Sequence, residues 1–225
     1  MTKPDIPGPG TAAPIRTVTI LGAGNVGRAL GSRLLDAGVA VRFGVRDQAA
    51  TARALSGPLA GLPALAPDAA AADADLIVVA VPAAAAVGAV RAARPMEGKI
   101  VLDCTNPLRW DGGPVWAPPA EGSLTQALAA AFPRVPVIKG FNHFGAEIQR
   151  QPALASGPVD ALFAGDDAAA KTRVMDLAAR MGFQPVDAGP LRNAALLENL
   201  AVLWIHLASV GGVGRNFGFR IEKQV

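Results

Sequence analysis

The sequence predicts an α/β fold in which helices cover both faces of a doubly wound, mainly parallel sheet. Two observations support this prediction. Hydrophobic residues make up 51% of the 225-residue chain and aromatic residues only 5%, a composition that suits small helices packed closely on a sheet. Short runs rich in Val, Ile and Leu alternate with longer stretches whose apolar residues recur at helical spacing. This length suits one domain with a single substantial core.

The first strand–helix–strand unit is the clearest part of the pattern. Residues 17–21 form a β-branched run typical of a buried strand. Residues 26–37 have helical spacing and stop at Gly38, and residues 39–45 form a second apolar run.

The segment between this strand and this helix carries a glycine motif. Its residues are Gly22, Ala23, Gly24, Asn25, Val26 and Gly27. In a dinucleotide site, the first glycine permits a tight turn, the second lets the backbone approach the pyrophosphate, and the third lets helix and strand pack closely. The alternative is a purely structural turn. Because the motif joins a strand directly to a helix, the sequence predicts a Rossmann-type domain that binds a dinucleotide.

The same alternation continues along the chain. Strands are expected at 76–81, 100–103, 135–138, 160–164 and 184–187, and helices at 68–74, 83–93, 123–132, 167–181 and 191–210. Ser123 and Gln126 form a capping-box pattern at the start of one helix. Segments 108–122 and 142–152 are expected to be loops. Glu198 and Asn199, on the last helix, are expected to face solvent or a partner helix.

We divide the chain into three parts. Residues 1–15, rich in Pro and Gly, are expected to form a disordered leader; residues 16–190 form the dinucleotide-binding domain; residues 191–225 form a small carboxyl-terminal helical extension on the domain or at a dimer interface. The apolar part of that extension leaves few polar faces, which predicts a homodimer. No stretch is suited to a signal peptide or a membrane span, and Cys104 is the only cysteine, so a cytoplasmic location is expected.

Charge and composition exclude several other classes of function. The formal net charge is +3 without a long basic run, which argues against nucleic-acid binding. The two histidines and single cysteine do not form a metal-ligand pattern, so no metal is expected.

The end of the second strand bears on the choice of cofactor. It reads Val45, Arg46, Asp47. A carboxylate in this region binds the ribose 2′-hydroxyl of NAD, whereas a cation binds the 2′-phosphate of NADP. The guanidinium of Arg46 favours NADP(H). Asp47 keeps the alternative open, because Arg46 could simply pair with it.

Ligands of this fold bind beyond the carboxyl ends of the strands. The residues expected there are Ala80, Val81 and Pro82 after one strand, Thr105, Asn106 and Pro107 after the next, and Asn142, His143 and Phe144 after another. The two prolines could also be turn residues and nothing more.

Several further segments follow the glycine motif in a specific order. They are Val45-Arg46-Asp47, Val81-Pro82, Asn106-Pro107-Leu108, Lys139-Gly140-Phe141-Asn142, residues 186–191, residues 197–205 and residues 214–219. Together they resemble the NADPH-dependent coenzyme F-420 (deazaflavin) reductase family of short dinucleotide-binding oxidoreductases. The cytosolic reductase domains of six-transmembrane metalloreductases resemble the same family.

This resemblance implies hydride transfer between NADP(H) and a deazaflavin whose ring stacks on the nicotinamide. Such a transfer needs orientation and a dry site more than strong acid–base catalysis. The chain departs from the family at two places: Val45 stands where a small hydroxyl residue is common, and His143-Phe144 replace a Thr and an aliphatic residue. Asn142 and His143 are the candidate catalytic residues, although His143 could equally be a loop residue without a role.

A planar acceptor also needs apolar walls. Trp110, Trp116 and Phe144 are the candidate substrate-binding residues, and both tryptophans could instead anchor their loop. Two other functions remain open. One is an NADPH-dependent reductase of a flavin, a ferric chelate or an imine or carbonyl; the other is a non-catalytic NADP(H)-sensing protein.

Overall fold

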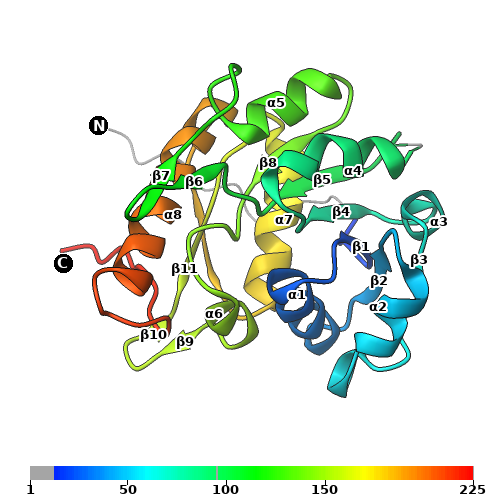
Figure 1. Ribbon diagram of the computed structural model, residues 1–225, viewed down its shortest axis with the longest axis horizontal. Coiled ribbons are helices and arrows are strands. Elements are labelled where there is room, and N and C mark those ends of the chain that lie inside the picture. The colour runs from blue at the N-terminus through cyan, green and yellow to red at the C-terminus, as the bar shows by residue number, and fades with distance from the viewer. Residues whose placement is uncertain (1–12, 95, 225) are drawn as a thin grey trace.

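The computed structural model describes residues 13–94 and 96–224. A six-stranded sheet with the order β3-β2-β1-β4-β5-β8 runs through the molecule, and all its neighbouring strands are parallel (Figure 1). The strands are β1 (Thr17–Leu21), β2 (Ala40–Gly44), β3 (Ala64–Leu65), β4 (Leu76–Val79), β5 (Ile100–Asp103) and β8 (Val137–Lys139). The order reverses between β1 and β4, so the predicted doubly wound Rossmann-type sheet is confirmed.

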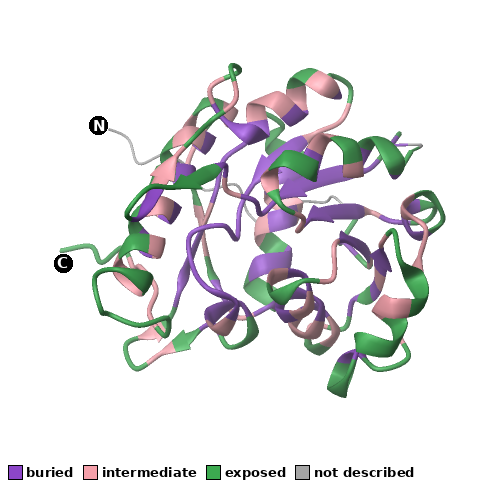
Figure 2. Ribbon diagram, viewed as in Figure 1, coloured by how far each residue is buried: buried purple, intermediate pink, exposed green. Residues whose placement is uncertain are grey.

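Successive side chains of the central strands pack into two different cores. Val18 and Ile20 of β1 belong to a cluster that also contains buried side chains of α1 (Asn25–Asp36), α6 (Ala146–Arg150) and α7 (Ala168–Arg180). Ile77 and Val79 of β4 belong to a second cluster, with α3 (Pro67–Ala71), α4 (Ala86–Ala92) and α5 (Leu124–Ala131). Because both faces are covered, β4, β5 and β8 are buried along their whole length and β1 over all but its first residue, as Figure 2 shows in purple.

The carboxyl-terminal third adds a smaller sheet and a long helix. β11 (Asp160–Phe163) pairs in parallel with β12 (Gln184–Asp187), and a single antiparallel bridge joins Ala164 to Lys139 at the end of β8. The last helix, α8 (Ala194–Ser209), follows a short 3-10 turn. The predicted strands at 160–164 and 184–187 and the predicted helices at 167–181 and 191–210 are therefore confirmed to within a few residues.

Two predicted loops contain regular structure. In 108–122, β6 (Leu108–Trp110) and β7 (Pro114–Trp116) form an antiparallel hairpin, and β7 packs against α8. In 142–152, α6 packs against α1. The expectation of loops was wrong here because contacts with distant helices stabilise both segments. β3 and α2 (Gln48–Ala54) are among the short elements that were not predicted. A further hairpin joins β9 (Ala153–Leu154) and β10 (Gly157–Pro158).

The folded part begins earlier than expected. Residues 1–12 of the expected leader lie outside the described residues. Ile15, however, is 1% exposed and belongs to the core. The main-chain oxygen of Ile15 accepts a hydrogen bond from Arg180 at 2.7 Å, and that of Ala13 accepts one from Arg173 at 2.9 Å. Residues 13–15 are therefore part of the domain, because an apolar side chain and two arginines fix them there.

In the part of the chain that the structure describes, no helix is long and apolar enough to cross a bilayer.

Candidate functional site

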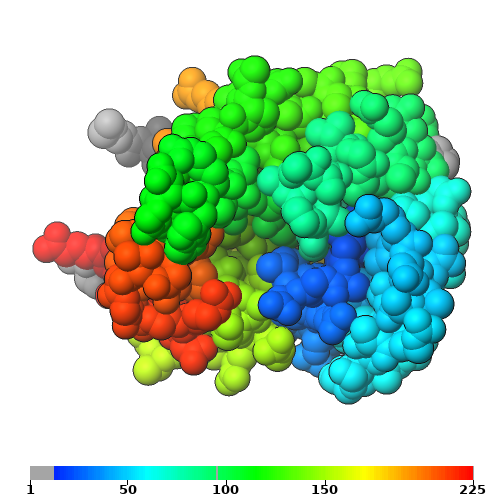
Figure 3. All heavy atoms as spheres, in the orientation of Figure 1, coloured from blue at the N-terminus to red at the C-terminus, as the bar shows by residue number. Residues whose placement is uncertain are grey.

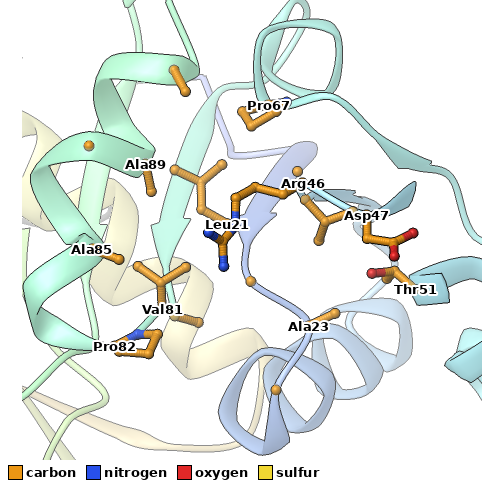
Figure 4. Close-up of a pocket in the computed structure, with 17 residues that line it drawn as sticks. Leu21, Ala23, Arg46, Asp47, Thr51, Pro67, Val81, Pro82, Ala85 and Ala89 are labelled. Carbon is orange, nitrogen blue, oxygen red and sulfur yellow. The ribbon is translucent and has the colours of Figure 1, made fainter. Parts of the chain in front are cut away.

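A cleft of about 890 Å³ lies at the carboxyl ends of β1, β2 and β4 (Figure 4). It brings together eight of the residues expected to bind the cofactor: Gly22, Ala23, Gly24, Val45, Arg46, Ala80, Val81 and Pro82. Residues that the sequence did not single out complete its wall, among them Thr51, Pro67, Ala85 and Ala89. Most come from α3, α4 and α2, which the glycine motif does not specify.

The geometry of the glycine motif shows which of its three glycines could not carry a side chain. Gly22 has a φ of +100°, and a Cβ there would lie 2.7 Å from the Ala80 carbonyl oxygen. A Cβ on Gly27 would collide with the carbonyl oxygen of Gly22. At Gly24, by contrast, an added Cβ would meet nothing within 4 Å. The first and third glycines are therefore required by the fold, whereas the second leaves space beside the backbone that a ligand can fill.

The amino-terminal end of α1 borders this space. Gly24 is the N-cap and has no side chain to cap the helix, and the first turn contains no acidic residue. The helix therefore presents main-chain N–H groups and the positive end of its dipole to the cleft, an arrangement suited to an anion. Asn25, Val26 and Gly27, which do not line the cleft walls, form this first turn.

At the end of β2, the two charged side chains have different roles. Asp47 is the N-cap of α2, and its Oδ1 accepts a hydrogen bond from the Ala50 N–H at 2.8 Å. Arg46 is exposed and points into the cleft (Figure 4). Among the described residues, no carboxylate lies within 4 Å of its guanidinium. The structure therefore does not contain the Arg46–Asp47 pair that the sequence left open, and Arg46 is available to a ligand.

The remaining predicted cofactor residues and the catalytic candidate Asn142 follow the next two strands of the sheet. Thr105, Asn106 and Pro107 follow β5, and Asn142 follows β8; none of them lines the cleft. The Asn142 side-chain amide donates to Asn106 Oδ1 at 2.9 Å, and the Asn106 amide donates to the Asn142 carbonyl oxygen at 2.8 Å. These two segments therefore form one linked unit. The space-filling view shows a hollow on this side, between the glycine loop in blue and the carboxyl-terminal segment in orange-red (Figure 3).

The structure does not place His143 where a substrate would contact it. Its side chain is fully buried, and Nε2 lies 3.1 Å from the Asp160 carbonyl oxygen. Burial lowers the pKa of His143 to about 4, so the ring is neutral near pH 7. The catalytic role considered for His143 has no support in this geometry, which agrees better with a packed core residue.

The three aromatic candidates for the acceptor pocket have different surroundings. Phe144 is 4% exposed and stacks on Phe183 with ring centroids 5.4 Å apart, so its expected place in the pocket wall was wrong: the ring belongs to the core. Trp116 is anchored, because its Nε1 donates to Glu198 Oε2 at 2.9 Å. Trp110 is 59% exposed at the end of β6. Of these three, Trp110 is the most exposed, and Trp116 is partly buried.

A buried charged cluster was missed by the sequence analysis. Lys139, Asp103 and Glu198 are all 0% exposed, and Lys139 Nζ lies 3.1 Å from Asp103 Oδ2 and 3.4 Å from Glu198 Oε1. Burial raises the pKa of Glu198. The positive charge of Lys139 and the hydrogen bond from Trp116 act in the opposite direction but do not cancel this increase. The expectation that Glu198 faces solvent or a partner helix was wrong. A charged residue within an apolar helix and another at the end of an apolar strand were the available signals.

Two features bear on metal binding and on thiol reactivity near this site. Within residues 13–94 and 96–224, no group of three or more His, Cys, Asp or Glu side chains is arranged to hold a metal ion. Cys104 is buried directly before Thr105, and burial raises the pKa of its thiol.

A family model and a solved structure identify the same family. Residues 17–107 match the family model described as "NADP oxidoreductase coenzyme F420-dependent". A solved structure from Arthrobacter sp. FB24, provisionally described as an F420-dependent NADP reductase, is 31% identical, with a TM-score of 0.80 over 92% of this chain and 99% of that chain. Hypothetical protein SMa0349 from Sinorhizobium meliloti is 26% identical, with a TM-score of 0.68 over 79% of this chain and 86% of that chain.

Curated relatives are longer proteins. Metalloreductase STEAP3 from Rattus norvegicus is 33% identical over 190 residues, which are 80% of this chain but 35% of the rat protein. The chain thus spans about a third of the length of that relative.

Proposed function

Since the chain belongs to the family of coenzyme F-420-dependent NADP oxidoreductases, we propose that it transfers a hydride between NADP(H) and coenzyme F-420. Family membership supports an NADP-dependent oxidoreductase, and coenzyme F-420 as the acceptor is our proposal. In this reaction the reduced nicotinamide gives up a hydride, the deazaflavin accepts it, and one proton enters from solvent.

The observation that carries the cofactor part of the proposal is the chemistry of the cleft, whereas the acceptor part follows from the family match. One end offers unpartnered space beside Gly24 and the amino terminus of α1, which suit a pyrophosphate. Just after the end of β2, Arg46 points into the same cleft and has no carboxylate partner among the described residues. A guanidinium in this position suits a 2′-phosphate. Apolar side chains such as Val81 and Ala89 form the remaining walls. These features fit NADP(H) better than NAD(H).

The chain's own residues would act mainly by positioning. Gly22, Gly24 and the first turn of α1 hold the phosphates, and Arg46 holds the 2′-phosphate. The linked segments at Asn106 and Asn142 border the expected nicotinamide side, with their amides fixed by each other. Hydride transfer between two stacked rings requires alignment rather than a titrating side chain, which suits a site beside which His143 is buried.

The test is an absorbance assay with the purified protein. NADPH and oxidised coenzyme F-420 are mixed, and the bands of reduced nicotinamide and of oxidised deazaflavin are followed together. We expect both to decrease at equal molar rates. Parallel reactions contain free flavin or a ferric chelate in place of the deazaflavin.

Each outcome selects one function. Turnover with the ferric chelate alone would replace the proposed acceptor by a metal, the class of acceptor that the name of the metalloreductase relatives gives. Tight NADPH binding without oxidation by any acceptor would indicate the sensing function instead. Turnover with coenzyme F-420 at a rate well above that with free flavin would support the proposal.

A further inference from the structure

The buried charged cluster is connected to the nicotinamide side of the site through Thr105. The Thr105 N–H and hydroxyl both donate to Asp103 Oδ1, at 2.9 and 2.6 Å, and Lys139 Nζ donates to the Thr105 carbonyl oxygen. Three polar atoms of one residue are therefore held by the cluster. Asn106 follows directly in the chain, so the direction in which it leaves the sheet depends on these bonds.

The same cluster holds helix α8 against the sheet edge. Glu198 of α8 accepts hydrogen bonds from the Leu124 N–H and from Trp116, both at 2.9 Å, as well as contacting Lys139. One residue earlier, the Leu197 carbonyl oxygen accepts a bond from the Asn142 amide at 2.9 Å. Consecutive residues of α8 thus hold Lys139 and Asn142, which are themselves three residues apart.

Stability alone does not account for such an arrangement. Removing two carboxylates and an ammonium from water is expensive, and buried ion pairs are often no more stable than apolar side chains of the same size. A fully buried cluster is also shielded from solvent, so it cannot exchange protons with a substrate directly. Its hydrogen bonds nevertheless fix the backbone at Thr105 with a geometry that an apolar core could not impose.

The backbone beside Asn142 is also strained. Phe141 has a φ of +53°, and no other non-glycine residue in the part of the chain described has a positive φ. Its carbonyl oxygen accepts a hydrogen bond from Gln149 at 2.9 Å. This left-handed turn directs Asn142 back toward Asn106, and surrounding contacts must compensate for it.

We propose that Lys139 is a positioning residue: through Asp103, Thr105 and Glu198 it sets the Asn106–Asn142 amide pair at the nicotinamide end of the site and ties that pair to α8. This inference rests on the proposed dinucleotide function. It divides the site into two halves, because the cleft that suits the adenosine 2′-phosphate end contains none of the cluster's residues.

The experiment compares Lys139→Met with the control Lys171→Met. Lys171 is a matched control because it is also a buried and paired lysine. It is 8% exposed, donates to the Gly189 carbonyl oxygen at 3.0 Å and pairs with Asp187 at 2.6 Å. It lies on α7, away from both halves of the site. For each variant we would measure the melting temperature, the Kd values of adenosine 2′,5′-bisphosphate and NADP⁺, and kcat and KM for hydride transfer. The bisphosphate occupies only the adenosine half.

For Lys139→Met we expect an unchanged Kd for the bisphosphate, a weaker NADP⁺ and a kcat reduced by up to about a hundredfold, the order of loss that a misplacement of about 1 Å causes. Lys171→Met should lower the melting temperature with the ratio of the two Kd values and kcat unchanged. Equal losses of bisphosphate and NADP⁺ affinity in Lys139→Met, or an unchanged kcat in the folded variant, would overturn the inference.

Lys139→Met leaves two carboxylates without their cation and could fail to fold. Thr125→Val is the milder test, because Thr125 only donates one hydrogen bond to Asp103 Oδ2, at 2.8 Å. It should leave the Kd of the bisphosphate unchanged, and it should weaken NADP⁺ binding and lower kcat by less than Lys139→Met does. Equal changes in the Kd values of the bisphosphate and NADP⁺ would contradict the inference. The two Kd values need no acceptor, so they remain decisive even if the wild-type protein does not reduce coenzyme F-420.

Discussion

Two adjacent residues, Arg46 and Asp47, show how a local contact resolves a cofactor preference. Their order in the sequence leaves open whether the guanidinium pairs with its neighbour. In the fold, Asp47 caps α2 by accepting the Ala50 N–H. A carboxylate engaged in this way satisfies a helix end, and Arg46 is left to point into the cleft. Val45 stands where the resembling family commonly has a hydroxyl residue. Thr51, one turn into α2, also lines the cleft and supplies a hydroxyl to the same wall.

Arg46→Ala should change the cofactor preference. A charge-assisted hydrogen bond contributes about 1.5–3 kcal/mol, which is roughly tenfold to a hundredfold in affinity. We therefore expect NADPH to bind more weakly by that factor while NADH changes little, as measured by titration of protein fluorescence. Arg53→Ala, which removes an exposed arginine from α2 outside the cleft, is the control. Equal weakening of NADPH and NADH would contradict the assignment of Arg46.

His143 gives a second prediction at this scale, for stability. Burial lowers its pKa from 6.5 to about 4, and the positive charge of Lys139 contributes in the same direction. The unfolded chain therefore takes up a proton near pH 6.5 that the folded protein resists until about pH 4. This difference stabilises the fold above pH 6.5 and is lost as the pH falls toward 4, by an amount on the order of 3 kcal/mol.

The measurement is urea unfolding between pH 7 and 4. His143→Phe should show a smaller decrease in unfolding free energy over this range than the wild type, whatever its stability at pH 7. Parallel pH profiles for the two proteins would show that the His143 pKa is not depressed.

At the scale of elements, the sequence predicted correctly those elements whose determining residues lie close together in the chain. The glycine motif, its strand and its helix occupy one short segment, and the cleft forms around them. Ser123 caps α5 as expected, with its Oγ accepting the Gln126 N–H at 3.1 Å. Hairpin β6–β7 and α6 could not be predicted in this way, because α8 and α1 stabilise them. The charged cluster joins residues 36 and 59 positions apart, a pairing that no local pattern encodes.

The hairpin carries a prediction about the acceptor. Trp110 is exposed at the end of β6, so its indole face is free to stack on a planar ligand. Trp110→Ala should raise the KM for the acceptor with little change in melting temperature or NADPH affinity. Phe144→Ala is the contrast: it removes a buried ring and should cost about 3–5 kcal/mol of stability. If Trp110→Ala leaves the acceptor kinetics unchanged, Trp110 does not form part of the pocket.

At the scale of the whole molecule, three exposed apolar side chains lie along one side of α8 and of the residue that follows it. Leu196, Leu203 and Val210 are 65%, 49% and 48% exposed and recur every seven residues, which places them on one helix face. The same helix supplies Glu198 and the Leu197 carbonyl oxygen to the nicotinamide side. A contact that covers the outer face of α8 would therefore also hold the inner face in place.

We propose that a second copy of the chain covers this face, as the apolar helix already suggested from the sequence. Contiguous exposed apolar surface is unfavourable in water and is typical of an interface. Light scattering at micromolar concentration should give twice the mass of the chain, and Leu203→Glu should reduce it to one, because each copy would bury a carboxylate at the interface without a partner. Ala130→Glu, on the exposed side of α5, should leave the mass unchanged. A wild-type mass equal to one chain would reject the dimer. A monomeric Leu203→Glu that keeps full hydride-transfer activity would show that α8 is held in place by its own contacts with the sheet.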